Sequence, residues 1–153
     1  MDPEEKLAGL GITLPDLPKP LGAYVPCVQS GNLLFISGML PLKDGKLMCT
    51  GKAGPEVSVE DAQACARQSA INALAVVKAH CGSLLKIRRC VKLNGFIASA
   101  PDFTDQPKVL NGASEFLLEV LGEKGLHARA AIGAAVLPLN ATVEIDFIFE
   151  IED

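Results

Sequence analysis

An arginine and a glutamate at the two ends of one apolar segment, Arg129 and Glu144, are the side chains of this sequence best suited to chemistry on a small molecule. A planar guanidinium forms a bidentate pair with a carboxylate and so fixes the orientation of a small anion. A carboxylate within hydrogen-bond reach can take a proton from water and later give it to a leaving group. Both charges are costly to bury without a partner. Two interpretations are open: the two side chains satisfy each other or lie in water, or Arg129 grips an anionic substrate while Glu144 handles a water or a proton.

Two strands, residues 127–137 and 142–150, are expected to carry these side chains. The second strand alternates, with Val143, Ile145, Phe147 and Phe149 on one face and Glu144, Asp146, Ile148 and Glu150 on the other. In a plain hairpin Glu144 would face about Ala135, which leaves Arg129 roughly 20 Å away at the rise of a strand. Either the strands are not neighbours, or the site joins residues of different subunits.

The remaining segments predict an α+β domain with the element order β-β-α-β-α-β-β. The expected elements are a hairpin over 24–28 and 32–37, a helix from a capping box at Ser58 to Gly82, a strand over 89–98, and a helix from Pro107 to Gly122. Gly38 is expected to mark either a bulge or a close approach of the backbone by a ligand, and Gly95 an irregularity of its strand. A short helix started by Asp2 and Pro3, followed by several prolines, predicts an N-terminal arm over residues 1–19, laid over a single domain of residues 20–153.

The predicted sheet is apolar on both faces, although two helices can cover only one of them. In the strand that carries Arg129, the side chains of Ala131, Gly133 and Ala135 alternate with those of Ile132, Ala134 and Val136. The uncovered face is therefore expected to be buried by another copy of the chain in a closed homo-oligomer.

Composition favours a cytoplasmic protein without a metal site. The chain has 153 residues, 49% of them hydrophobic, and a net charge of -4. It has no apolar run near the ~18 residues that a membrane span needs, and no secretory or transit signal. Five cysteines, an odd number without Cys-x-x-Cys spacing, predict reduced thiols rather than disulfides or a zinc site. His80 and Cys81 are adjacent, which makes a poor chelate on a helix.

Several short motifs, taken in order, resemble the Rid (YjgF) family of reactive-intermediate deaminases, also labelled the endoribonuclease L-PSP family. They are Tyr24, the segment 31–38, Asp102-Phe103, Asn111, Arg129, Leu137-Pro138 and Val143-Glu144-Ile145. The proline-rich arm and the loop at 51–54 resemble a longer-armed subgroup. The resemblance implies a chorismate-mutase-like α+β sandwich, with two helices on one face of a mixed sheet. It also implies a homotrimer with pockets between subunits.

The resemblance further implies an activity. Active members of the family hydrolyse enamines and imines such as 2-aminoacrylate to 2-keto acids and ammonia, without metal or cofactor. By position, Arg129 matches the residue that holds the substrate carboxylate and Glu144 the residue that places water. Tyr24 and Asn111 match pocket residues, and Ser37 with Gly38 matches a segment whose backbone contacts the ligand.

Three departures from the family pattern leave the substrate open. Ala131 stands where a cysteine is frequent, Met39 where a glutamine is frequent, and His127 where a proline is frequent. We interpret His127 as a solvent-exposed residue at the start of a strand, in preference to a role in proton transfer.

Three other functions are considered. A non-catalytic small-carboxylate-binding or regulatory trimer could use the same pocket without turnover. RNA cleavage or translation inhibition is disfavoured, because a net charge of -4 and one tyrosine provide neither a phosphate-binding surface nor a stacking platform. The basic cluster of Lys86, Arg88, Arg89 and Lys92 is interpreted as a solvated strand edge. Chorismate mutase activity would rest on fold analogy alone.

Overall fold

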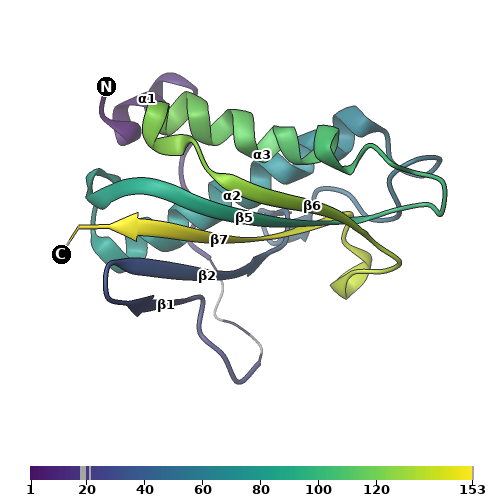
Figure 1. Cartoon of the computed structure of the whole chain (residues 1–153), viewed down its shortest axis with the longest axis horizontal. Helices are drawn as coiled ribbons and strands as arrows, with labels where there is room; N and C mark the ends of the chain where they lie inside the picture. The colour runs from purple at the N-terminus through teal and green to yellow at the C-terminus, as the bar shows by residue number, and fades with distance from the viewer. Residues whose placement is uncertain (18–19, 21, 153) are drawn as a thin grey trace.

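A five-stranded sheet with helices on one side forms the body of the protein (Figure 1). The structure is a computed structural model and describes residues 1–17, 20 and 22–152. The strands lie in the order β1 (Cys27–Ser30), β2 (Leu33–Met39), β7 (Val143–Ile151), β5 (Ile87–Ala98) and β6 (Ala128–Ala134). β5 and β6 are parallel and the other neighbours are antiparallel, so the predicted mixed sheet is confirmed.

The predicted helices are present with the expected ends. They are α1 (Pro3–Gly9), α2 (Val59–Cys81) and α3 (Gln106–Leu121), with short 3-10 turns at Leu84–Lys86, Gly122–Gly125 and Pro138–Asn140. The hydroxyl of Ser58 accepts a hydrogen bond from the Asp61 N–H at 3.1 Å and caps α2, and Gly82 ends it at a φ of 84°. A separate two-stranded hairpin, β3 (Leu42–Lys43) and β4 (Lys46–Leu47), adds to the predicted order.

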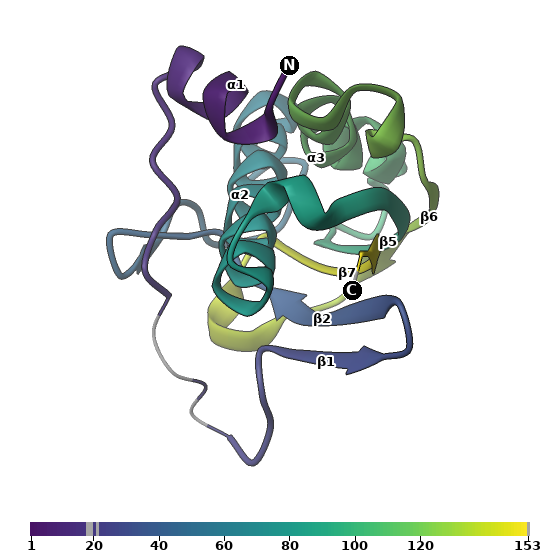
Figure 2. The same cartoon turned by 90° about the vertical axis from the view of Figure 1, so that its left-hand side faces the viewer.

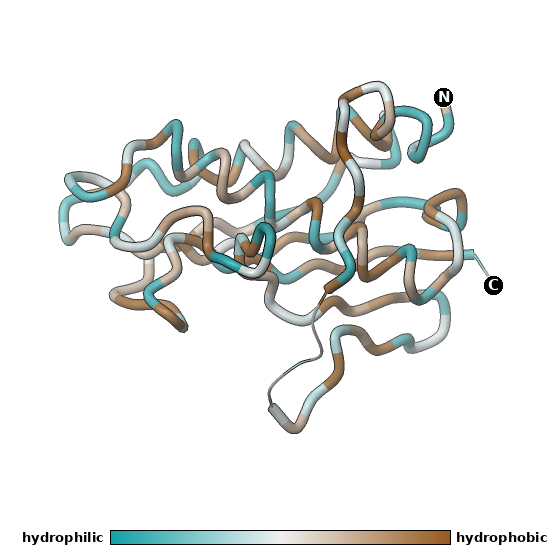
Figure 3. Tube along the Cα trace, turned by 180° about the vertical axis from the view of Figure 1, so that it is seen from behind, coloured by the Kyte–Doolittle hydropathy of each residue, from teal (hydrophilic) through white to brown (hydrophobic). Residues whose placement is uncertain are grey.

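The core lies between the helices and one face of the sheet. The alternation predicted for β7 is confirmed, because Val143, Ile145, Phe147, Phe149 and Ile151 are buried toward α2 and α3 while the residues between them are half-buried on the other face. Figure 3 shows the chain from behind, with hydrophobic and hydrophilic residues both present along its strands and helices. Burying one face of every strand makes the sheet register strongly specified.

The two predicted irregularities have different outcomes. The pairing of β2 with β7 shifts between Ile36 and Met39, so the bulge predicted at Gly38 is confirmed. The prediction for Gly95 is wrong, because the shifts along β5 come earlier, between residues 87 and 92. A Cβ on Gly95 would lie 2.6 Å from the Leu110 side chain, so this glycine instead makes room for α3.

The face of the sheet opposite the helices is open and partly apolar. Figure 2 shows the curved sheet with the helices gathered on one side of it. Val28, Phe35 and Ile148 follow one another across the strands on the open face, and Ile132 lies further along it. The exposed fractions of Phe35 and Ile132 are 41% and 51%. Burial of this face by another copy of the chain stays a prediction.

The N-terminal arm packs back onto the domain. Asp2 caps α1 by accepting from the Glu4 N–H at 2.8 Å, as predicted. Leu7 is 3% exposed and belongs to the main core. The carboxylate of Glu4 pairs with Lys78 on α2 at 2.5 Å. The predicted arm of residues 1–19 includes positions 18 and 19, which lie outside the described residues.

The fold corrects the interpretation of the cysteines and confirms that of the basic cluster. The sulfur atoms of Cys49 and Cys65 lie 2.01 Å apart as a disulfide, so the prediction of five reduced thiols is wrong for this pair. The contact arises because the loop after β4 folds against α2, which the spacing of cysteines in the sequence does not reveal. The interpretation of the basic cluster as a solvated strand edge is confirmed, because Arg88, Arg89 and Lys92 are exposed and β6 pairs with β5 only from Lys92 onward. In the described part of the chain, every helix is too short or too polar to cross a membrane.

Candidate functional site

The strands that carry Arg129 and Glu144 are not neighbours, because β5 lies between them. Arg129 on β6 is level with Leu93 of β5, and Glu144 on β7 is level with Phe96. The plain hairpin between residues 127–137 and 142–150 is therefore excluded.

The two side chains also lie on opposite faces of the sheet. Arg129 is on the helix side, where its cross-strand neighbour Leu93 is fully buried and its guanidinium reaches α3. Glu144 is on the open side, between the buried residues Val143 and Ile145 that point to the helices. Within one chain the sheet separates them, so the interpretation that Arg129 and Glu144 satisfy each other is wrong.

Arg129 is held by neutral oxygens at the edge of the sheet beside α3. Its Nη1 donates to the hydroxyl of Ser114 at 3.0 Å, and its Nη2 donates to the carbonyl of Pro107 at 3.2 Å. Residues 107, 111 and 114 fall on one stripe of the helix, so Asn111 lies between these two partners of the guanidinium. The structure thus brings together Arg129 and Asn111, two of the predicted site residues.

His127 belongs to the same group, and its predicted exposure to solvent is wrong. The ring is partly buried, with Nε2 at 2.8 Å from the Ser114 hydroxyl and Nδ1 at 2.6 Å from the Gly125 carbonyl. The 3-10 turn after α3 places Gly125 beside the start of β6, which orients the ring toward the helix.

Glu144 lies with the other predicted residues on the opposite face. A Cβ on Gly38 would lie 3.0 Å from the Glu144 carboxyl group, so the missing side chain leaves the space that this carboxyl occupies. The pKa of Glu144 is raised, first by burial and then by the nearby negative charge of Asp146. Among the described residues, no hydrogen bond or ion pair satisfies the Glu144 carboxyl group.

The segment before β1 completes this second group. The hydroxyl of Ser37 donates to the carbonyl of Val25 at 2.7 Å, and the Ser37 N–H donates to the Pro26 carbonyl at 2.9 Å. The predicted site residues therefore form two groups on opposite faces, Arg129 with Asn111 and Glu144 with Ser37 and Gly38. Tyr24 precedes the segment that Ser37 binds and is 60% exposed.

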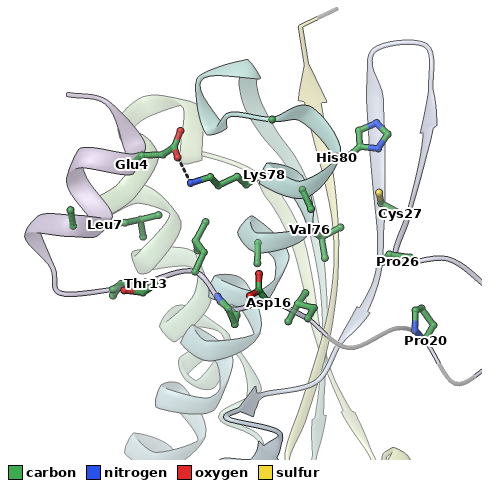
Figure 4. Close-up of a pocket in the computed structure, with 18 residues that line it drawn as sticks. Glu4, Leu7, Thr13, Asp16, Pro20, Pro26, Cys27, Val76, Lys78 and His80 are labelled. Carbon is green, nitrogen blue, oxygen red and sulfur yellow. Dashed lines mark ion pairs between the residues drawn. The ribbon is translucent and has the colours of Figure 1, made fainter.

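A groove of about 960 Å³ lies elsewhere, between the N-terminal arm, α2 and the start of β1 (Figure 4). Leu7 from the arm and Val76 from α2 are among its walls, and the ion pair of Glu4 with Lys78 lies at one end. None of the predicted site residues lines it. We therefore place the candidate site at the two groups described above and not in this groove.

Sequence reasoning missed Ser114, although a signal was present. It is a polar residue on an otherwise apolar face of α3, and it follows Pro107 and Asn111 at helical spacing. It is 9% exposed, and a buried hydroxyl needs partners, which His127 and Arg129 supply.

Comparison with known proteins decides the family. Residues 4–151 match the family model described as "YjgF/chorismate_mutase-like, putative endoribonuclease". The chain belongs to the YjgF family. This match begins inside the N-terminal arm and extends over nearly the whole chain.

Individual relatives within the YjgF family cover most of the chain. Protein TCP17 of Trypanosoma cruzi is 43% identical over 148 residues, which are 96% of this chain and 92% of that protein. A 2-iminobutanoate/2-iminopropanoate deaminase of Dermatophagoides farinae is 34% identical over 142 residues, 92% of this chain and 95% of that protein. The crystal structure of Atu1372 from Agrobacterium tumefaciens, a protein of unknown function, has a TM-score of 0.92 and 53% identity and covers 99% of this chain and 92% of its own.

Proposed function

We propose that the protein hydrolyses small imines and enamines that carry a carboxylate, of the 2-aminoacrylate type, to 2-keto acids and ammonia. The observation that carries this proposal is the environment of Arg129. Neutral oxygens of Ser114 and Pro107 hold its guanidinium, and no carboxylate pairs with it among the described residues. A fixed, partly buried cation without an anionic partner is suited to receive a substrate carboxylate. The deaminase of Dermatophagoides farinae, 34% identical, supports the same reaction class.

The complete site takes Arg129 from one copy of the chain and Glu144 from another. The sheet separates these side chains within a protomer, and the open face next to Glu144 carries exposed apolar side chains such as Phe35 and Ile132. Large exposed apolar patches mark interaction surfaces. We propose a homotrimer, in which one protomer presents its open face to the next and brings Glu144, Ser37 and Gly38 to Arg129 and Asn111 of its neighbour.

In the proposed mechanism, Arg129 binds the carboxylate and leaves the C=N carbon facing Glu144. The imine reacts in its N-protonated form, with that proton taken from solvent. Glu144, as the carboxylate, takes a proton from water while the water oxygen adds to the C=N carbon and the electron pair of the double bond moves to nitrogen, which becomes a neutral amino group. Glu144 then gives its proton to this nitrogen, the C–N bond breaks as the hydroxyl oxygen forms the keto carbonyl, and the hydroxyl proton returns to solvent, so that ammonia and the keto acid are released. For an enamine, protonation at carbon comes first, and a carboxyl group with a raised pKa is a suitable acid. No step in this sequence needs a cofactor.

The proposal is tested by measuring ammonia and keto-acid release while a dehydratase generates 2-aminoacrylate. Glu144→Gln is expected to lower kcat by about 10²–10⁴-fold, the usual contribution of a general acid–base. Arg129→Ala is expected to weaken carboxylate binding by about 10–100-fold, the value of a charge-assisted hydrogen-bond pair. The matched control is Arg89→Ala, which removes an exposed arginine paired with Glu150.

The outcomes separate the candidate functions. The proposed activity is contradicted if the natural protein releases ammonia and keto acid no faster than buffer does and Arg129→Ala behaves like the natural protein. Binding of pyruvate in calorimetry without turnover selects the non-catalytic carboxylate-binding trimer instead.

A further inference from the structure

His127 lies at one end of a hydrogen-bonded chain that leads to Arg129. Its Nδ1 is 2.6 Å from the carbonyl oxygen of Gly125, and its Nε2 is 2.8 Å from the hydroxyl oxygen of Ser114. The same hydroxyl oxygen is 3.0 Å from Nη1 of Arg129. Ser114 lies in the middle of α3, His127 is the residue before β6, and Arg129 lies within β6.

The chemistry of the groups determines which atom donates and which accepts in each of these hydrogen bonds. A carbonyl oxygen only accepts, so Nδ1 of His127 must carry the proton that the Gly125 carbonyl receives. In a neutral imidazole the other nitrogen is then an acceptor, so the Ser114 hydroxyl donates to Nε2. With its proton committed to His127, the Ser114 oxygen presents lone pairs to the guanidinium, which only donates. These proton positions are assigned from the hydrogen-bond network.

This pattern of donors and acceptors matters for Arg129. A serine hydroxyl can rotate, and without an acceptor for its proton it could point that proton at the guanidinium or at a substrate carboxylate. Ser114 is 9% exposed, so water has little access to compete for the hydroxyl. The Pro107 carbonyl holds the second terminal nitrogen at 3.2 Å, so both ends of the guanidinium fork are fixed while further N–H donors stay available for a ligand.

We propose that His127, acting through Ser114, is the positioning residue that fixes the guanidinium of Arg129 for a substrate carboxylate. The inference rests on the proposed function for the identity of the ligand, but the tautomer and the ordering of Arg129 do not depend on turnover. Groups that preorganise a binding side chain raise affinity by removing the cost of ordering it on binding. His127 is therefore expected to act on substrate affinity and not on the chemical step.

The first measurement is the tautomer of His127, read from the ¹⁵N shifts of its ring at about pH 8, where an ordinary histidine is neutral. The chain has two histidines, so the spectrum of His127→Phe contains only His80 and assigns both. Nδ1 is expected to be protonated and Nε2 unprotonated. In His127→Phe, the Nη protons of Arg129 are expected to lose their separate, slowly exchanging signals. Protonation of the neutral ring at Nε2 overturns the proposal.

The second measurement is the affinity for pyruvate together with the kinetics of imine hydrolysis. His127→Phe and Ser114→Ala are each expected to raise the Kd for pyruvate and the KM by about tenfold, the value of one net hydrogen bond, with kcat little changed. The double variant is expected to bind pyruvate no more weakly than either single variant, because each single substitution already breaks the same series of hydrogen bonds. His127→Gln, whose side-chain oxygen can accept from Ser114, is expected to recover most of the affinity.

Controls distinguish a positioning role from a structural one. His80→Phe removes a ring that contacts Gln29 at 2.8 Å on the surface and is expected to leave pyruvate affinity unchanged. Additive effects of the two single substitutions, or equal affinities in His127→Phe and the natural protein, overturn the proposal. If Arg129→Ala also leaves affinity and turnover unchanged, the proposed function fails as well. If Arg129→Ala is impaired while His127→Phe is not, only the positioning role fails.

Discussion

Two impaired variants of this protein are expected to restore activity to each other when their subunits are mixed and assayed at low substrate concentration. One variant carries Arg129→Ala and keeps Glu144, and the other carries Glu144→Gln and keeps Arg129. In the structure these side chains lie on opposite faces of the sheet, with β5 between their strands. A site that needs both must therefore be assembled from two protomers, and each mixed interface can pair one intact arginine with one intact glutamate.

The expected recovery follows from counting interfaces. In an equal, random mixture half of the protomers supply an intact Arg129 and half supply an intact Glu144. The chance that one interface has both is about one quarter, so about a quarter of the natural activity should return in a ring of identical interfaces. The recovery should be greatest at equal amounts and fall on either side. A site contained in one protomer predicts no recovery at any ratio.

The assay is ammonia release after co-refolding the two variants from urea, with each variant refolded alone as the baseline. A second mixture, of the natural protein with a chain that carries both substitutions, provides the matched control. Assembly of the site between protomers predicts about one quarter of the natural activity in this equal mixture, and a site within one protomer predicts about one half. The reasoning is refuted if no activity is recovered in the first mixture and about one half of the natural activity remains in the second.

Three further predictions concern stability and assembly. Gly112→Ala should lower the free energy of unfolding in urea by about 1–3 kcal/mol, because a Cβ there would lie 2.1 Å from the Gln63 carbonyl on α2. Gly9→Ala is its control, since a Cβ on that helical glycine meets nothing within 4 Å, and equal losses in both would contradict the packing argument. Glu144→Gln should stabilise the fold relative to the natural protein at neutral pH but not below about pH 4. Burial raises the pKa of Glu144 in the folded state, so the natural protein loses stability as the pH rises through that pKa while glutamine does not titrate. A pH-independent difference in melting temperature would reject that cause. Ile132→Asp should lower the assembled fraction in sedimentation velocity, because Ile132 is 51% exposed on the open face, whereas Leu85→Asp, at a residue 56% exposed outside the sheet, should not. Unchanged assembly in Ile132→Asp would show that this part of the face is not an interface.

Local features were predictable because they depend on neighbouring residues. The alternation from Val143 to Ile151 is visible in the sequence, since side chains of a strand point to opposite faces with a period of two. The cap at Ser58 and the left-handed end at Gly82 follow from the same local logic. The bulge at Gly38 was also predicted. The close contact of Gly38 with the Glu144 carboxyl group was not, because Glu144 lies far along the chain.

The predictions that were wrong depended on contacts between distant segments. The sequence does not reveal that Gly95 makes room for Leu110, or that Cys49 lies beside Cys65, because these contacts exist only after α2 and α3 dock. For the same reason His127 was expected in solvent, whereas the turn at Gly125 and the hydroxyl of Ser114 bind both of its ring nitrogens.

The sequence by itself determined the element order, the faces of the strands and the candidate residues Arg129 and Glu144, because helix and strand periodicity are local properties of the chain. Only the tertiary structure decided that β5 separates their two strands and that the guanidinium and the carboxyl group face opposite sides of the sheet. Strand order is set by which apolar faces can be buried together under the two helices, and that depends on the whole chain at once.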